Sequence, residues 1–406
     1  MGDSAQAGRL RWPIYLLAGF PVVDYFLRIY PWGIVGKTWY ELILIATALF
    51  AMRSYMLNGR KEMYPTQKMV LFMAVLGFVY ILMDIGYVEV ALAGYKIDFI
   101  FMLFAVLLPY VVAKEDIVPI LKLMVMTGFL LGIHGVYEYI TKAPVPSTWN
   151  VIGENVRSRV YSLFGSPNIL GAYVAFLLPT TIGMGLYQKA KGERLFYFVA
   201  AGFMTLTLLF TFTRGAWIAG FVGVFVLALL WDKRLAVAAA VFAVLAALFV
   251  HPVQTRIDEF FSPVYWHQTL QNGRIAEWLR AYDQMVNNPL FGAGIGRYGG
   301  AVASKFFGII YVDGYYAHML AELGLVGFTA FMYLLFVYLR DVWRVWKRTT
   351  DPQMKILIAG VFGSLIAVVT HNLVENVFEE PAMNMLFWLS GTLILIYGAK
   401  DGEDHA

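Results

Sequence analysis

Residues 194–231 read RLFYFVAAGFMTLTLLFTFTRGAWIAGFVGVFVLALLW. They form two apolar runs, 194–212 and 215–231, separated by a short turn that carries Arg214. A helix needs about 20 apolar residues to cross the hydrocarbon core of a bilayer. The stretch therefore predicts two antiparallel membrane-spanning helices with an arginine at the turn between them.

The rest of the chain repeats this pattern. Of its 406 residues, 60% are hydrophobic and 14% are charged, whereas a soluble domain has about 25% charged residues. We predict an all-α, polytopic membrane protein with about 12 transmembrane helices and one large external loop containing amphipathic helices. The predicted spans are 12–30, 39–57, 68–87, 97–113, 118–140, 166–187, 194–212, 215–231, 234–250, 315–339, 354–374 and 382–398.

The placement of charge predicts the domain organisation and the orientation. Most of the 31 Lys and Arg residues fall on the side of the predicted membrane that holds both termini, so the positive-inside rule makes the termini cytoplasmic. Residues 1–250 would hold the first nine spans, 251–314 the large external loop, and 315–406 the last three spans and a cytoplasmic C-terminus. The net charge of +4 is too small to imply a nucleic-acid partner.

The external loop contains an amphipathic segment after Asn272-Gly273. Its apolar residues recur at helical spacing, and charged residues occupy the opposite face. The apolar residues are Ile275, Trp278, Leu279, Tyr282, Met285 and Val286. We predict a helix here that lies either on the membrane surface or over the bundle.

Arg214 has two interpretations of equal weight. An arginine between such apolar runs should lie at the outer interface, where a charge without a partner is costly. It could hold a phosphate with its guanidinium fork, helped by the backbone N–H groups at the start of the following helix. It could also extend to the lipid headgroups, with no further role.

Further arginines reach the same side. Arg157 and Arg159 precede Asn168 at the sixth span, and Arg274 begins the amphipathic segment. A cation in the first turn of a helix opposes the helix dipole unless an anion is bound there. Arg280 is better explained as a solvated surface charge. Arginines from separate segments fit a diphosphate carried on a lipid better than an ion pathway, which would need charges through the depth of the membrane.

Acidic and histidine residues suggest proton transfer. Asp313 precedes the tenth span, and His318 and Glu322 follow on one helix face. They could relay a proton from an acceptor hydroxyl, but a His–Glu hydrogen bond that ties helices together is the favoured interpretation of Glu322. His371 and Glu375 repeat the four-residue spacing at the end of the eleventh span. No H-E-x-x-H motif is present, and we predict no metal.

Four motifs in this order resemble the O-antigen ligase and O-antigen polymerase family of membrane glycosyltransferases. They are RVYSLFGSPNILG at 159–171, TRGAW at 213–217, GRIAEW at 273–278 leading to PLFGAG at 289–294, and the stretch from Asp313 to AELGLVG at 321–327. The resemblance covers roughly residues 155–330 in motifs and the whole chain in topology.

The resemblance implies a function. Family members transfer a glycan from undecaprenyl diphosphate to a hydroxyl of an acceptor glycan or glycolipid, at the outer face of the bacterial cytoplasmic membrane, with no metal or other cofactor. By similarity, Arg214 and Arg274 would bind the diphosphate. Ligases of the family usually carry His-Asn where this chain has Asp313-Gly314. This departure favours a polymerase of surface-polysaccharide repeat units, with Asp313 as candidate base and His318, one turn away, as its substitute.

Three alternatives remain open at this point. The chain could be an O-antigen ligase that transfers the glycan to lipid A core or another acceptor. It could be a transporter or flippase of lipid-linked oligosaccharide, although clear repeats and interrupted helices with polar sites near the midplane are not evident. It could also be an assembly subunit whose arginines bind only membrane lipids.

Overall fold

The computed structural model describes residues 11–30, 32–59, 63–144, 159–309 and 311–399. All regular elements among them are helices. The first group is α1 (Arg11–Ala18), α2 (Phe20–Ile29), α3 (Ile34–Asn58), α4 (Pro65–Met83), α5 (Val88–Asp98), α6 (Phe104–Leu107) and α7 (Ile117–Thr141). The second is α8 (Pro167–Tyr187), α9 (Lys191–Phe210), α10 (Arg214–Trp231), α11 (Lys233–Phe249), α12 (His251–Phe261), α13 (Pro263–Gln271) and α14 (Arg274–Asn287). The last is α15 (Ala301–Phe307), α16 (Tyr315–Arg348), α17 (Pro352–His371) and α18 (Pro381–Gly398).

The all-α, polytopic class is confirmed, but the number of spans is smaller than the twelve predicted. Within the described residues, nine helices are long and apolar enough to cross a membrane, or up to 11 if each of two bent pairs counts as one span. The predicted span 12–30 is instead two short helices, α1 and α2. Pro21 lies in the first turn of α2, the one place in a helix where a residue without an N–H fits, so the chain starts a new helix there.

The two bent pairs lie at the predicted spans 97–113 and 234–250. Helical segments Ile85–Asp98 and Phe101–Tyr110 meet at 43°, and Lys233–Phe249 meets Val253–Phe261 at 82°. The predicted span 97–113 therefore begins at one bend, and the predicted span 234–250 ends at the other.

Small residues bring α8, α10 and α17 close together. A Cβ on Gly183 would lie 3.1 Å from the Cα of Gly360, and one on Gly363 would lie 2.4 Å from the carbonyl oxygen of Gly223. Thr180 of α8 also hydrogen-bonds Ser364 of α17 at 2.8 Å. Small residues and hydroxyl pairs are typical of helix contacts in membranes. This packing fixes the start of α10 beside the end of α17.

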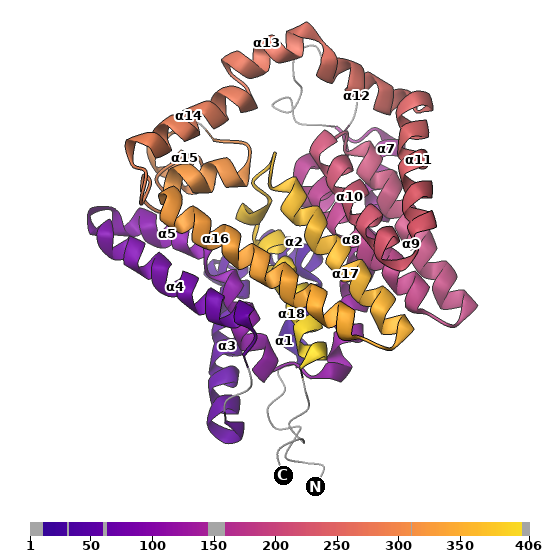
Figure 1. Cartoon of the computed structure of the whole chain (residues 1–406), viewed down its shortest axis with the longest axis horizontal. Helices are drawn as coiled ribbons and strands as arrows, with labels where there is room; N and C mark the ends of the chain where they lie inside the picture. The colour runs from indigo at the N-terminus through magenta and orange to yellow at the C-terminus, as the bar shows by residue number, and fades with distance from the viewer. Residues whose placement is uncertain (1–10, 31, 60–62, 145–158, 310, 400–406) are drawn as a thin grey trace.

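Helices α11 to α14 form an arch over one end of the bundle (Figure 1). The predicted amphipathic helix is confirmed as α14. It packs on α16 and buries Ala276, Ala281 and Met285, while Leu279 and Tyr282 on its apolar side stay more than half exposed. Helix α14 thus covers the bundle with one edge and leaves an apolar stripe uncovered.

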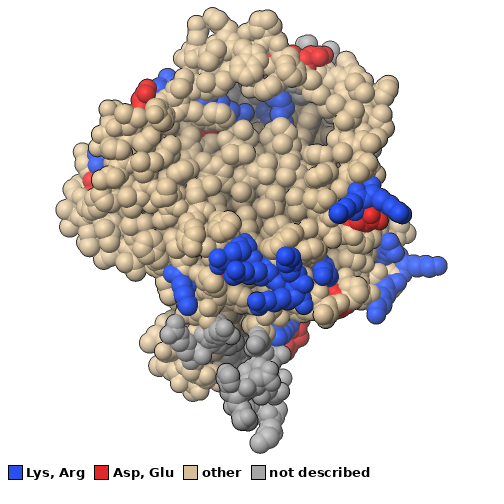
Figure 2. Space-filling model, viewed as in Figure 1, with Lys and Arg blue, Asp and Glu red and all other residues tan. Residues whose placement is uncertain are grey.

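Charge is distributed unevenly over the surface. Figure 2 shows a broad uncharged area and, below it, a gathering of Lys and Arg side chains. It also shows basic atoms inside a hollow near the top of the molecule, in the region of the arch. An uncharged band between two charged ends is what a membrane-spanning bundle needs.

Candidate functional site

The site lies where five segments meet at the arched end of the bundle. They are the segment before α8, the start of α10, the start of α14, the segment before α16, and residues 371–380, which connect α17 to α18. Contacts between side chains from these segments define the site.

Arg159 supports the turn before α10. Its Nε donates to the Thr211 carbonyl at 2.9 Å, and its Nη2 donates to Asn168 Oδ1 at 2.9 Å and Thr213 Oγ1 at 3.1 Å. Asn168 in turn donates from Nδ2 to Glu375 Oε2 at 3.0 Å. Arg159 therefore links the α9–α10 turn, the start of α8 and the α17–α18 connection.

Arg214 is the first residue of α10 and is half-buried. Its guanidinium carbon lies 4.7 Å from the ring centroid of Tyr265 on α13, which is within cation–π range. Arg214 thus sits at a helix N-terminus under the arch, where backbone N–H groups and a cation favour the same negatively charged ligand.

Gly215 and His371 pack together directly beside Arg214. A Cβ on Gly215 would lie 2.8 Å from Val374 Cγ2 and 3.1 Å from His371 Nε2. His371 is buried, and neither of its ring nitrogens has a hydrogen-bond partner among the residues that the structure describes. The glycine allows α10 to approach the end of α17 this closely.

Arg274 lies between two carboxylates. Its Nε is 3.2 Å from Asp313 Oδ2, and its Nη2 is 3.6 Å from Glu375 Oε2. A cation at the start of a helix is more favourable with an anion beside it. In the structure Asp313 and Glu375 supply it, and their side chains come from two other segments.

Asp313 is held through its backbone. Its N–H donates to Glu277 Oε2 at 3.1 Å, and Trp278 Nε1 donates to its carbonyl oxygen. The next residue, Gly314, has φ +127° and donates to Asn376 Oδ1 at 3.2 Å. These contacts leave the Asp313 carboxylate directed at Arg274 and otherwise accessible.

Glu375 has an unusual protonation equilibrium. Burial and, to a smaller extent, the Asp313 carboxylate raise its pKa to about 7 against the opposing effects of Arg274, Arg159 and the hydrogen bond from Asn168. A carboxyl group that titrates near neutral pH next to two arginines is a candidate for proton transfer.

Comparison with known proteins agrees with this arrangement of motifs. A family model described as O-antigen ligase matches residues 199–332. This match supports the resemblance of the chain to the O-antigen ligase and polymerase family. The matched segment contains Arg214, Arg274 and Asp313. The chain is thus a multi-pass membrane protein of a glycosyltransferase type.

No curated protein matches the chain. A solved structure described as "Structural coordination of polymerization and crosslinking by a peptidoglycan synthase complex" shares 14% identity with a TM-score of 0.47, covering 84% of this chain and 98% of that one.

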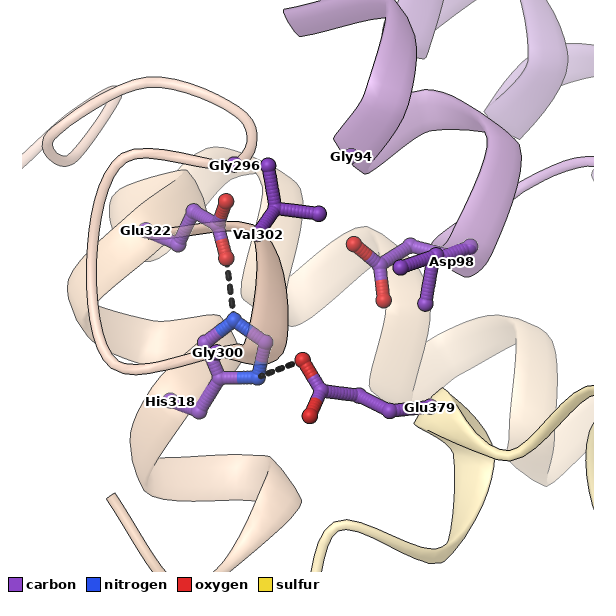
Figure 3. Close-up of a pocket in the computed structure, with 9 residues that line it drawn as sticks. Gly94, Asp98, Gly296, Gly300, Val302, His318, Glu322 and Glu379 are labelled. Atoms are coloured by element: carbon purple, nitrogen blue, oxygen red, sulfur yellow. Dashed lines mark hydrogen bonds and ion pairs between the residues drawn. The ribbon is translucent and has the colours of Figure 1, made fainter. Parts of the chain in front are cut away.

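His318 belongs to a different cluster from Arg274 and Asp313. It hydrogen-bonds Glu322, as their spacing predicts, and its Nδ1 lies 3.9 Å from Glu379 Oε1 (Figure 3). Asp98 on α5 lies on another side of the same cluster. Glu379 also accepts from the backbone N–H of Ala301 at 2.9 Å. The cluster joins α5, α16 and the α17–α18 connection, so it fits a structural tie better than a proton relay to Asp313.

The remaining predicted residues are less central. Arg280 is exposed on α14, and its charge acts on Tyr298 and on Glu277. Arg157 lies outside the described residues. Sequence reasoning did not identify Tyr265 and Glu277, which contact Arg214 and Asp313. The position of Glu277 three residues after Arg274 was a usable signal, whereas nothing in the sequence ties Tyr265 to Arg214.

Proposed function

We propose that this protein polymerises oligosaccharide repeat units carried on undecaprenyl diphosphate, at the outer face of the bacterial cytoplasmic membrane. One observation carries the proposal. A continuous chain of contacts runs beside the helix N-terminus that bears Arg214. It joins, in order, Arg159, Asn168, Glu375, Arg274 and Asp313. The arrangement offers both an anion site and carboxylates within one site.

Each part has a task in glycosyl transfer. The acceptor hydroxyl oxygen attacks the anomeric carbon of the donor, and the bond from that carbon to the diphosphate oxygen breaks. The leaving diphosphate keeps the electron pair, and Arg214 and Arg274 stabilise its growing negative charge. The hydroxyl proton passes to a carboxylate beside Arg274. The sequence nominates Asp313 for this role.

The proposed orientation follows from charge. Helix α10 runs from Arg214, at the site, to Trp231, next to Lys233 and Arg234. The basic residues at the far ends of the helices favour the cytoplasmic side, so the arch and the site would face the exterior. A lipid-linked glycan could then reach the site from the outer leaflet.

The choice of polymerase over ligase rests on one position. The family's ligases carry a histidine where this chain has Asp313, which points to a different acceptor. The product separates the two: a ladder of lengthening lipid-linked glycan indicates a polymerase, and single transfer to a lipid A core indicates a ligase.

The test uses the purified full chain with a lipid-diphosphate-linked repeat unit in liposomes. Removing one positioned donor to a developing oxyanion costs about 10²–10³ in rate, so the double variant Arg214→Ala, Arg274→Ala should elongate glycan at least about 10³-fold more slowly. Arg234→Ala, an exposed arginine just beyond the other end of α10, is the matched control and should elongate normally.

Two results would overturn the proposal. Wild-type rates from the folded double variant would remove the anion site from the mechanism. Translocation of the lipid across a sealed bilayer with unchanged glycan length would identify a transporter instead.

A further inference from the structure

Two carboxylates flank Arg274, and their surroundings differ. The Asp313 side chain is 35% exposed and that of Glu375 is 17% exposed. Among the described residues, the Asp313 carboxylate contacts Arg274, whereas that of Glu375 contacts both Arg274 and Asn168. The two groups are therefore suited to different tasks in the same reaction.

We propose that Glu375, rather than Asp313, is the catalytic base that accepts the proton of the acceptor hydroxyl, and that Asp313 is a positioning residue. This inference rests on the proposed glycosyl transfer and names the group that completes it. Neither the family match nor the likeness to a solved structure assigns this role to Glu375.

The two oxygens of Glu375 are in different states. Oε2 accepts from Asn168 Nδ2 at 3.0 Å and lies 3.6 Å from Arg274 Nη2, so it is held in place. Oε1 makes no hydrogen bond within the described part of the chain. It is also not among the buried side-chain atoms there that lack a hydrogen-bond partner, so it is accessible. A carboxylate with one fixed oxygen and one open oxygen is prepared to receive a proton from a bound molecule.

The neighbours of Glu375 set its affinity for that proton. Arg274 on α14 and Arg159 before α8 favour the charged form, and Asp313 before α16 opposes it. On its own segment, its backbone N–H donates to the carbonyl of His371 at 3.1 Å. Burial is the largest influence and raises the pKa of Glu375 to about 7, which suits a base that works near neutral pH.

Arg274 couples the base to the donor. The guanidinium that would bind the diphosphate is the same one that lies 3.6 Å from Glu375. An anion bound at Arg274 offsets the positive charge that Glu375 senses, so donor binding strengthens the base. The proton then moves from the acceptor hydroxyl to Glu375 Oε1 as the new glycosidic bond forms. The diphosphate leaves with its electron pair beside Arg214 and Arg274.

The experiment compares Glu375→Gln with Asp313→Asn in the full chain, using single-turnover glycan transfer from pH 5 to 9. Wild type should gain activity as pH rises, with a midpoint at or above about 7, because bound donor raises the pKa of Glu375 further. Glu375→Gln should lower kcat by about 10²–10⁴-fold, abolish that rise, and change the KM for the lipid donor by less than about threefold. A group that only orients Arg274 would instead raise KM.

The Asp313→Asn variant tests the assignment from the other side. This variant retains the Glu375 carboxylate, so it should lose less activity than Glu375→Gln. Because removing the Asp313 charge lowers the pKa of Glu375, its activity should rise at lower pH. Glu375→Asp, which retains a carboxylate, should keep a pH-dependent rise even if Glu375→Gln fails to fold.

Three results would overturn the inference. One is an inactive Asp313→Asn beside an active Glu375→Gln. Another is an unchanged pH profile in Glu375→Gln. The third is a loss of the pH-dependent rise in Glu375→Asp. Absence of any transfer by wild type would instead refute the proposed function, and it is measured first.

Discussion

Replacing Gly324 with alanine should destabilise the fold severely. This glycine lies at a break in α16, with φ 62° and ψ −168°, a conformation that is essentially restricted to glycine. A Cβ there would lie 2.5 Å from the backbone N of Gly292 and 2.6 and 2.7 Å from the carbonyl carbon and oxygen of Leu290. Backbone atoms cannot move aside as a flexible side chain can.

The magnitude follows from what must give way. The backbone conformation costs about 1–3 kcal/mol for a residue other than glycine. Relieving the contacts would separate segment 289–294 from the break, where Leu325 donates to the Pro289 carbonyl at 2.8 Å and Gly294 donates to the Glu322 carbonyl at 3.0 Å. Each lost hydrogen bond costs about 1 kcal/mol, so the total is roughly 3–5 kcal/mol.

The assay is thermal unfolding of purified protein in detergent, followed by intrinsic fluorescence. A loss of this size should lower the apparent Tm by roughly 5 °C or more. Gly202→Ala is the control, because Gly202 is exposed on α9 and a Cβ there meets nothing within 4 Å. An apparent Tm for Gly324→Ala within 2 °C of the control, by this rough scale, would refute the reasoning.

Three further outcomes are expected. His371→Phe keeps a buried ring but removes two nitrogens that lack partners in the described part of the chain, so the apparent Tm should stay equal or rise; a clear fall would contradict this. Because the pKa of Glu375 is raised to about 7 from 4.5, the stability it contributes is complete below pH 4.5 and is lost as pH rises through about 7. Wild type should therefore have a lower Tm at pH 8 than at pH 5. Glu375→Gln should reduce that difference without abolishing it, because the pKa of Glu380 is also raised to about 7. An undiminished Tm difference in Glu375→Gln would contradict the role of Glu375. Tyr265→Leu removes the ring 4.7 Å from the Arg214 guanidinium and should change the KM for the lipid donor by about two- to fivefold, whereas an unchanged KM would separate this ring from donor binding.

Spans could be predicted where the signal is local. The two runs on either side of Arg214 became α9 and α10 because hydropathy over about 20 residues reports directly on membrane insertion. The break at Gly19 was missed, because apolar residues continue on both sides of it. Hydropathy measures how apolar a segment is, not whether its helix is continuous.

The site could be predicted in part for a similar reason. Arg274 at the start of a helix favoured a nearby anion, which we predicted to be the diphosphate, whereas the structure places the Asp313 and Glu375 carboxylates beside it. The bond between Asn168 and Glu375 joins residues 207 positions apart, and it depends on how α8 packs against α17. Local patterns cannot report such a contact, so Glu375 could be named from its sequence position but not given its place beside both arginines.

The family motifs divide into two groups by what they contact. Arg214 and Arg274 belong to the proposed anion site, and Arg159 supports the turn before Arg214. The Glu322-to-Gly324 stretch instead binds the backbone of segment 289–297. Glu322 accepts from the Arg297 N–H at 3.1 Å and also hydrogen-bonds His318. A buried carboxylate with these partners holds segment 289–297 onto α16, and removing it would leave a buried donor unsatisfied. Loss of activity in a Glu322 variant would therefore be explained first by a damaged fold. Loss of activity in an Arg274 variant with an unchanged Tm would instead indicate a role of Arg274 in the reaction.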